Sequence, residues 1–295
     1  GAGALGLADA GVVRDDLTFR LAVWQLGLDR SLQAGEYHFD RSMSALQVAD
    51  KISRGRVYLR SITFPEGLTI EEMAAVFHNH PFGSSDDFLV AAQRVELVAD
   101  LDTSARNLEG YLFPETYALP RDATAEDLVE AMVLQFRQVF TDALRAEARL
   151  RELTIREVVT LASLIQKETG RVDEHALVSA VYTNRLRIGM PLQCDPTVIY
   201  GLQLDGLYDG NLTRKNLRHD SPYNTYVYGG LPPGPIAAPG QQALEAVFKP
   251  ADVSHLYFVS RNDGTHEFAD TLREHNRNVQ RYQVRSFRRL RAERR

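Results

Sequence analysis

The segment 155–169 carries a carboxyl group that is well placed for proton transfer. Its apolar residues recur at spacings of three and four: Val158, Leu161, Ala162 and Ile165. This period predicts a helix with one buried face, and Glu168 continues that stripe. Burial and the negative end of the helix dipole both disfavour the charged form, so we expect the pKa of Glu168 to be raised toward the range of a general acid near neutral pH. The alternative is that Glu168 turns outward to water or pairs with Lys167 or Arg171.

Motifs for other chemistries are absent or incomplete. Residues 1–6 match the glycine pattern of dinucleotide-binding loops, but no strand precedes them in the chain, as pyrophosphate binding requires. No serine-hydrolase elbow occurs, and no histidine pair has the spacing of zinc proteases. The single cysteine, Cys194, allows neither an intrachain disulfide nor a cysteine-based zinc site. We therefore expect no cofactor and no metal, and a net charge of −5 argues against nucleic acid as a partner.

A small α+β module is predicted near the N-terminus. Short strands are expected over 35–39 and 57–64, with a helix over 44–52 between them. A second helix should follow the capping box of Thr69 and Glu72, in which each residue satisfies a backbone N–H of the other.

The remaining chain predicts a larger mixed α+β domain. The expected elements are a helix over 124–148, a helix from the capping box of Thr154 to Gly170, a helix capped by Asp173 that runs to Arg187, a hairpin over 256–268 and a last helix from Leu272. The predicted division is an N-terminal region of residues 1–80 and a second domain of residues 81–295. No apolar stretch reaches the roughly 18–20 residues that a membrane-spanning helix needs.

Several motifs follow one another along most of the chain, from about residue 60 to residue 276. They are Phe64-Pro-Glu-Gly-Leu-Thr-Ile70, Leu108-Glu-Gly-Tyr-Leu-Phe-Pro-Glu-Thr-Tyr117, Leu161-Ala-Ser-Leu-Ile-Gln-Lys-Glu-Thr169, Asn184-Arg-Leu-Arg-Ile-Gly-Met190, Leu192-Gln-Cys-Asp-Pro-Thr-Val-Ile-Tyr200, Tyr223-Asn-Thr-Tyr226 and Gly230-Leu-Pro-Pro-Gly234. In this order they closely resemble the endolytic murein transglycosylase family, also called YceG-like.

The resemblance implies an α+β fold in which a LysM-like module precedes the catalytic domain. It implies an enzyme that cuts the β-1,4 bond between N-acetylmuramic acid and N-acetylglucosamine in peptidoglycan glycan strands without water, leaving 1,6-anhydro ends and ending strand elongation. It further implies a single-pass protein of the inner membrane, with an anchor before Gly1, an extracytoplasmic catalytic part, and peptidoglycan synthases as partners.

The catalytic acid of that family corresponds to Glu168. It would protonate the departing glycosidic oxygen and then, as a carboxylate, remove the proton of the sugar's C6 hydroxyl. Many members carry glutamate where this chain has Gln166, whose amide we expect to orient substrate. Two alternatives therefore stay open, an inactive peptidoglycan-binding scaffold and a hydrolytic muramidase that uses water.

Further substrate contacts are predicted from polar side chains in the other motifs. Gln193 and Asp195 alternate with apolar neighbours, so a short strand would turn both toward the cleft. The other candidates are Glu115, Tyr223, Asn224, Thr225, Tyr226 and Asn276, the last with His275 as its alternative. The segment 281–295 carries seven Arg and one Glu, which predicts a solvated helix end or contact with an anionic polymer or membrane surface.

Overall fold

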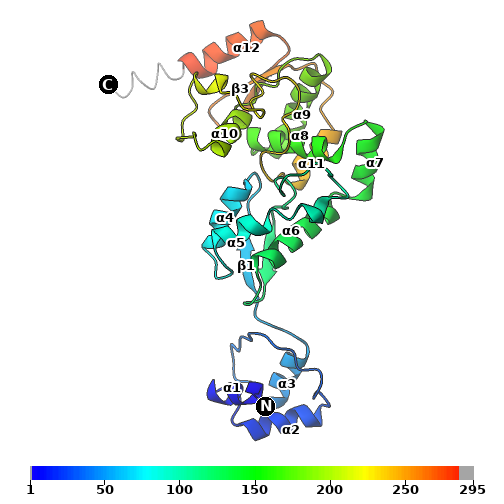
Figure 1. Cartoon of the computed structure of the whole chain (residues 1–295), viewed down its shortest axis with the longest axis vertical. Coiled ribbons are helices and arrows are strands. Elements are labelled where there is room, and N and C mark those ends of the chain that lie inside the picture. Colours follow the sequence, from blue (N-terminus) through cyan, green and yellow to red (C-terminus); the bar gives the residue numbers. More distant parts are fainter. Residues whose placement is uncertain (1, 286–295) are drawn as a thin grey trace, which may run out of the picture. The chain divides into compact units, whose positions relative to one another are not determined.

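The computed structural model describes residues 2–285, which form two compact units (Figure 1). The first unit takes in the chain up to Ile62, together with His80–Phe82 and Thr116–Thr124. The second contains Thr63–Asn79, Gly83–Glu115 and the chain from Ala125 onward. Their boundary does not coincide with the predicted one at residue 80, because the helix at 70–78 belongs to the second unit.

Three helices and a small sheet make up the first unit. The helices are α1 (Ala2–Asp9), α2 (Asp16–Gln25) and α3 (Ala45–Ser53), and β1 (Arg60–Thr63) pairs with β2 (Thr116–Leu119). Apolar faces of α2 and α3 form the core, with Phe19 and Val48 among its buried residues. The strand predicted over 35–39 is wrong: this segment is a loop, joined to the 57–58 segment by the backbone hydrogen bond from Tyr58 N to Glu36 O (2.6 Å). The LysM-like character of this unit stays a prediction.

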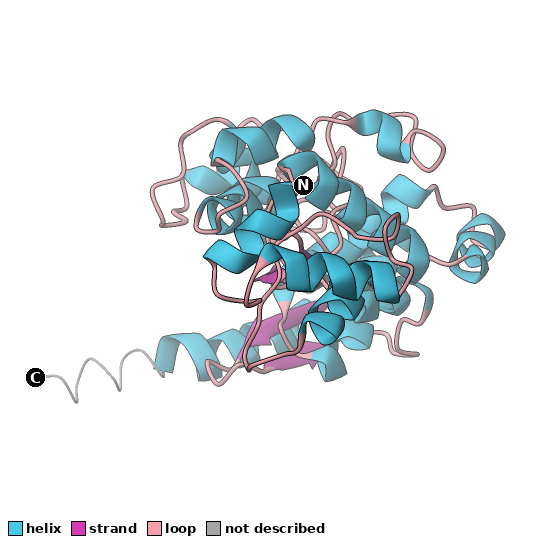
Figure 2. Cartoon of the chain, turned by 90° about the horizontal axis from the view of Figure 1, so that it is seen from below, coloured by secondary structure: helices cyan, strands magenta, loops and turns pink. Residues whose placement is uncertain are grey.

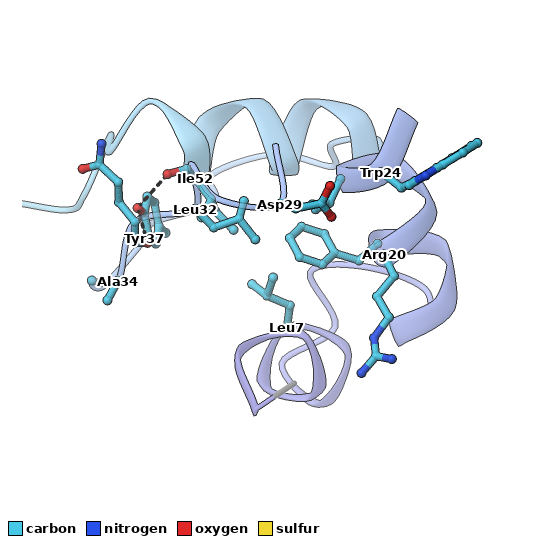
Figure 3. Close-up of a pocket in the computed structure, with 12 residues that line it drawn as sticks. Leu7, Arg20, Trp24, Asp29, Leu32, Ala34, Tyr37 and Ile52 are labelled. Atoms are coloured by element: carbon cyan, nitrogen blue, oxygen red, sulfur yellow. Dashed lines mark hydrogen bonds between the residues drawn. The ribbon is translucent and has the colours of Figure 1, made fainter. Parts of the chain in front are cut away.

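A pocket of about 940 Å³ opens in the first unit (Figure 3). Its wall is mainly apolar and includes Leu7, Leu32 and Ile52. The Tyr37 hydroxyl lies within hydrogen-bonding distance of two carbonyl oxygens, those of Gln33 (2.9 Å) and Ile52 (3.1 Å), which ties the loop to α3. No residue predicted for the site lines this pocket.

Helices dominate the second unit, and the strands are few (Figure 2). Its elements in order are α4 (Ile70–His78), α5 (Ser85–Ala91), η1 (Val95–Val98), α6 (Ala125–Val139), α7 (Asp142–Leu150), α8 (Ile155–Glu168), α9 (Val172–Arg187), α10 (Asp195–Leu204), η2 (Asn216–Arg218), α11 (Gln241–Phe248), β3 (Tyr257–Ser260), β4 (His266–Ala269), α12 (Leu272–Val279) and η3 (Gln280–Arg285). The α+β class is confirmed.

Local signals in the sequence set several of these elements. The capping box predicted at α4 is present, with Glu72 N donating to Thr69 Oγ1 (3.2 Å) and Thr69 N to Glu72 Oε2 (2.8 Å). The predicted hairpin is also confirmed, since β3 and β4 pair antiparallel. Its turn places Asn262 (φ 65°) and Gly264 (φ 85°) in the left-handed region, which these residue types tolerate best.

Three predictions about the second unit are wrong. The helix expected over 124–148 is two helices, because Thr141 accepts a hydrogen bond from Leu144 N (3.4 Å) and starts α7. The strand expected around Asp195 is instead the start of α10, where Pro196 fits because the first helical turn leaves its N–H groups without helical partners. Asp173 does not cap α9, which begins at Val172.

The described chain ends in α12 and η3. Among residues 2–285, no helix combines the length and the apolar composition that crossing a membrane requires. The structure describes the basic segment 281–295 only as far as residue 285, so the prediction for the rest of it lies outside the described residues.

Candidate active site

Helix α8 positions Glu168. The capping box of Thr154 and Glu157 opens the helix, and every residue from Val158 to Ile165 is buried. The helix ends after Glu168 because Thr169 adopts an extended backbone (φ −143°, ψ 132°). Glu168 is half-buried, so the predicted inward direction of its side chain is the one observed.

Thr169 anchors the backbone directly after Glu168. Its hydroxyl donates to Glu174 Oε2 (3.0 Å), and its carbonyl lies 3.2 Å from His175 Nε2. Burial opposes the charge of Glu174, but hydrogen bonds from the backbone and ring of His266 outweigh it and hold the pKa of Glu174 below its ordinary value. The Thr169 hydroxyl is thus used inside the protein, where it holds the end of α8.

Four side chains, two from α9 and two from the start of α10 and its cap residue Cys194, surround the Glu168 carboxyl. The thiol of Cys194 donates to Oε2 (S···O 3.5 Å). Burial raises the pKa of Glu168 to about 7, and the negative charge of Asp195 acts in the same direction. The Cys194 thiol, the Tyr182 hydroxyl and the Arg185 guanidinium favour the carboxylate and limit this rise. Glu168 is therefore close to half-protonated near neutral pH, as acid–base catalysis requires.

Arg185 and Cys194 are both held by burial and hydrogen bonding. The guanidinium of Arg185 donates to the carbonyl oxygens of Leu192 (2.7 Å) and Leu256 (2.7 Å), which fixes the chain just before Cys194. Cys194 is fully buried, which raises the pKa of its thiol well above the ordinary value. It remains a thiol at neutral pH and therefore a donor to Glu168.

Asp195 and Tyr226 form a second polar group beside Glu168. The Tyr226 hydroxyl donates to Asp195 Oδ1 (2.6 Å). Asp195 is exposed and opens α10, where the helix dipole favours a negative charge. A second hydrogen bond joins the segments that carry Asp195 and Tyr226, because Cys194 N donates to Thr225 Oγ1 (3.0 Å). The motifs at 192–200 and 223–226 are therefore neighbours in space.

Asn224 and Thr225 have a different role from the predicted one. Both are buried, and Asn224 donates to the carbonyl of His219 (2.8 Å) while accepting from Tyr226 N (2.9 Å). The Thr225 hydroxyl lies 2.9 Å from that of Thr197. Their polar groups are satisfied within the protein, so we assign both residues to holding the loop that presents Tyr226.

Three further predicted substrate-binding residues lie in the second unit: Gln166, Gln193 and Tyr223. Gln166 Oε1 accepts from Gly240 N (3.1 Å), which ties α8 to the chain before α11. Gln193 is exposed and has a left-handed backbone (φ 48°), unusual for a residue with a side chain. Tyr223 packs edge-to-face on Tyr200, with ring centres 4.9 Å apart.

Glu115 and Asn276 lie on other segments of the second unit. Glu115 is exposed, and its carbonyl accepts from Phe64 N (3.0 Å). Asn276 is exposed on α12 and lines a surface pocket with Arg273 and Arg277. Their roles in substrate binding stay predictions. Of the two α12 candidates, His275 is the one connected to Arg185, because both pack on the ring of Tyr257.

Sequence reasoning missed two features. Tyr182 and Arg185 flank Asn184 on α9, but their spacing alone gives no sign that they reach Glu168. Glu109 is a further buried carboxyl, 5% exposed, which accepts from Ile70 N and from the Tyr200 hydroxyl (both 3.2 Å). Burial raises its pKa to about 8. A carboxyl inside an apolar motif was the available signal for Glu109.

Comparisons with known proteins agree on one family. The sequence profile of the YceG-like family matches residues 4–281. An endolytic murein transglycosylase of Bacillus subtilis (strain 168) is 33% identical over 288 residues, covering 92% of this chain and 78% of the relative. One of Streptococcus pneumoniae (serotype 2, strain D39) is 29% identical, and the chain spans 54% of its length. The crystal structure of a yceG-like protein from Listeria monocytogenes has a TM-score of 0.67 at 31% identity, with 92% of both chains covered.

Proposed function

Because this chain belongs to the YceG-like family, we propose that it is an endolytic murein transglycosylase. It cuts peptidoglycan glycan strands at the β-1,4 bond between N-acetylmuramic acid and N-acetylglucosamine and leaves 1,6-anhydro ends. The observation that carries the mechanism is a half-buried Glu168 whose pKa is raised to about 7 beside a second, exposed carboxylate, Asp195.

The first step is protonation of the leaving group. Protonated Glu168 donates its proton to the glycosidic oxygen, the bond from that oxygen to C1 of the muramic acid breaks, and N-acetylglucosamine leaves with a free hydroxyl. Positive charge develops at C1 and the ring oxygen. Asp195, which accepts a hydrogen bond from the Tyr226 hydroxyl, places a negative charge near Glu168 and thereby stabilises that centre.

The second step closes the anhydro ring. Glu168, now a carboxylate, removes the proton of the C6 hydroxyl while the C6 oxygen bonds to C1. The proton that Glu168 lost is thus regained, and no water enters the product. Because nucleophile and electrophile belong to one bound sugar, proximity supplies much of the rate.

Asp195 is also the observation that favours a second candidate, a hydrolytic muramidase. Ordinary glycosidases use two carboxyl groups that flank the scissile glycosidic bond, and the second of them activates water or attacks C1. Asp195 would then perform that role. The products separate the two reactions, since hydrolysis leaves reducing ends and transglycosylation leaves anhydro ends.

Gln166 does not argue for an inactive scaffold. Its side-chain oxygen accepts a hydrogen bond from Gly240 N, which gives the residue a structural use that needs no charge. The proposed acid is Glu168, which this chain retains.

The test is digestion of purified glycan strands with mass analysis of the products. We expect anhydro ends, each lighter by one water than the corresponding reducing end. Glu168→Gln is the matched control, because the amide fills the same volume but has no acidic proton to transfer, and we expect a loss of about 10²–10⁴ in rate with the fold kept. Reducing ends would support the muramidase, and intact strands would support the scaffold.

We also propose the finer aspects of location and partners. The catalytic part acts outside the cytoplasmic membrane, on a full-length protein held by one membrane-spanning segment, near synthases that make nascent strands. The N-terminal unit would act as a LysM-like module. Membrane fractionation of the full-length protein and crosslinking to synthases in cells test these two points.

A further inference from the structure

One buried hydroxyl next to the proposed acid has no hydrogen-bond partner. Tyr182 is 1% exposed, and its hydroxyl oxygen makes no hydrogen bond of good geometry among residues 2–285. Edge-to-face packing on Phe258, with ring centres 6.2 Å apart, holds the ring in place. A buried hydroxyl without a partner is costly, and such groups in native proteins call for a reason.

The surroundings of Tyr182 point to Glu168. The hydroxyl lies against the Cys194 thiol and close enough to Glu168 to influence it. The Cys194 thiol already donates to Glu168 Oε2. The other charged groups that face Glu168 are Asp195, at the start of α10, and Arg185, one turn along α9 from Tyr182.

Two further groups complete this environment. The Tyr226 hydroxyl already donates a hydrogen bond to Asp195, so it is not available to Glu168. Lys167, the neighbour of Glu168 on α8, donates to the carbonyl oxygen of Gly67 (3.0 Å). Tyr182 is thus the one uncommitted hydroxyl donor of those that face Glu168 among the described residues.

We propose that Tyr182 is a positioning residue whose hydroxyl donates a hydrogen bond to the Glu168 carboxylate once Glu168 has given its proton to the glycosidic oxygen. This inference rests on the proposed function for its place in the cycle. The carboxylate gains a new acceptor lone pair at that moment, and the Tyr182 hydroxyl is a nearby donor that has no other partner. A hydrogen bond to a charged group is stronger than one between neutral groups, so Tyr182 favours the charged state of Glu168 over the neutral one.

The bond also prepares the second step. A carboxylate held by Tyr182 and Cys194 keeps a defined orientation while it takes the C6 proton. When Glu168 is protonated again, the bond to Tyr182 is released, and the resting state with its unpartnered hydroxyl returns. No group other than Glu168 changes its proton count in this cycle.

Tyr182→Phe tests the proposal, because it removes only the hydroxyl. The measurement is the NMR titration of Glu168 in the whole chain, carboxyl-labelled with ¹³C on glutamate and assigned with Glu168→Gln. We expect the pKa of Glu168 to rise by about one unit in Tyr182→Phe. We also expect kcat to fall several-fold while KM stays unchanged.

Tyr111→Phe is the matched control. Tyr111 is equally buried, at 1% exposed, and its hydroxyl donates to Asp102 (2.8 Å) rather than to the Glu168 group. We expect this variant to leave the pKa of Glu168 unchanged. A purely structural role for Tyr182 also predicts no change, so an unmoved or lowered pKa in Tyr182→Phe overturns the inference. The titration needs no turnover, so it stands apart from the product analysis, which decides the proposed function.

Discussion

Glu109 provides the sharpest quantitative test of how burial shapes this protein. Its carboxyl is 5% exposed and accepts two hydrogen bonds, from Ile70 N at the start of α4 and from the Tyr200 hydroxyl on α10. Burial raises its pKa from 4.5 to about 8, although these hydrogen bonds oppose the rise. Glu109 is therefore protonated in the folded protein at pH 7, whereas it is ionised in the unfolded chain.

The difference in pKa makes the free energy of unfolding depend on pH. Between about pH 4.5 and pH 8 the folded state binds more protons than the unfolded state, so stability falls as the pH rises through this window. At about 1.4 kcal/mol for each pH unit, the full window gives an upper bound of about 5 kcal/mol. Glu109→Gln removes this dependence, because the amide oxygen accepts the same two hydrogen bonds and carries no titrating proton.

Urea denaturation from pH 5 to pH 9 measures the effect. Far-UV circular dichroism is the suitable probe, because the single tryptophan, Trp24, lies in the first unit. We expect Glu109→Gln to match the wild type near pH 5 and to exceed it by a few kcal/mol near pH 8. Glu126→Gln, at an exposed glutamate on α6, should follow the wild type throughout. A gap between Glu109→Gln and the wild type that does not widen with pH would refute the reasoning.

Two further predictions concern the site itself. Asp195→Asn removes the negative charge that raises the pKa of Glu168, so the alkaline limb of kcat/KM should move to lower pH, by about one unit, while the products keep their anhydro ends. An unmoved limb in pH–rate measurements would mean that this charge does not reach Glu168. Gln166→Glu should retain activity within about tenfold in the strand-digestion assay, because a carboxylate accepts the same hydrogen bond from Gly240 N. Complete loss of cleavage in that variant would contradict the structural role of Gln166.

The pKa of Glu168 results from opposing contributions with separate origins. Burial and Asp195 raise it, whereas Cys194, Tyr182 and Arg185 lower it. Removing Asp195's charge and removing Tyr182's hydroxyl should therefore shift the titration in opposite directions. This pair of variants separates an electrostatic role of each residue from a general loss of structure, which would not change sign between them.

The sequence by itself determined the features that depend on near neighbours. The capping residues of α4 and α8 act over three positions, and the turn of the β3–β4 hairpin needs only the residues between its strands. The apolar period of α8 placed Glu168 on the buried side, and with burial came the direction of its pKa. These interactions lie within one or two helical turns, so the order of residue types specifies them.

Only the tertiary structure decided which groups meet Glu168. Cys194 lies 26 positions from it in sequence, and Tyr226 lies 31 positions from Asp195. The local pattern around Asp195 predicted a strand, but the chain forms a helix there. At Asn224 it predicted a substrate contact, whereas the side chain is hydrogen-bonded within its own loop. Contacts between distant segments depend on where the chain reverses and on how helices pack, and neither the spacing of residues nor their type encodes the distance between two side chains from different helices.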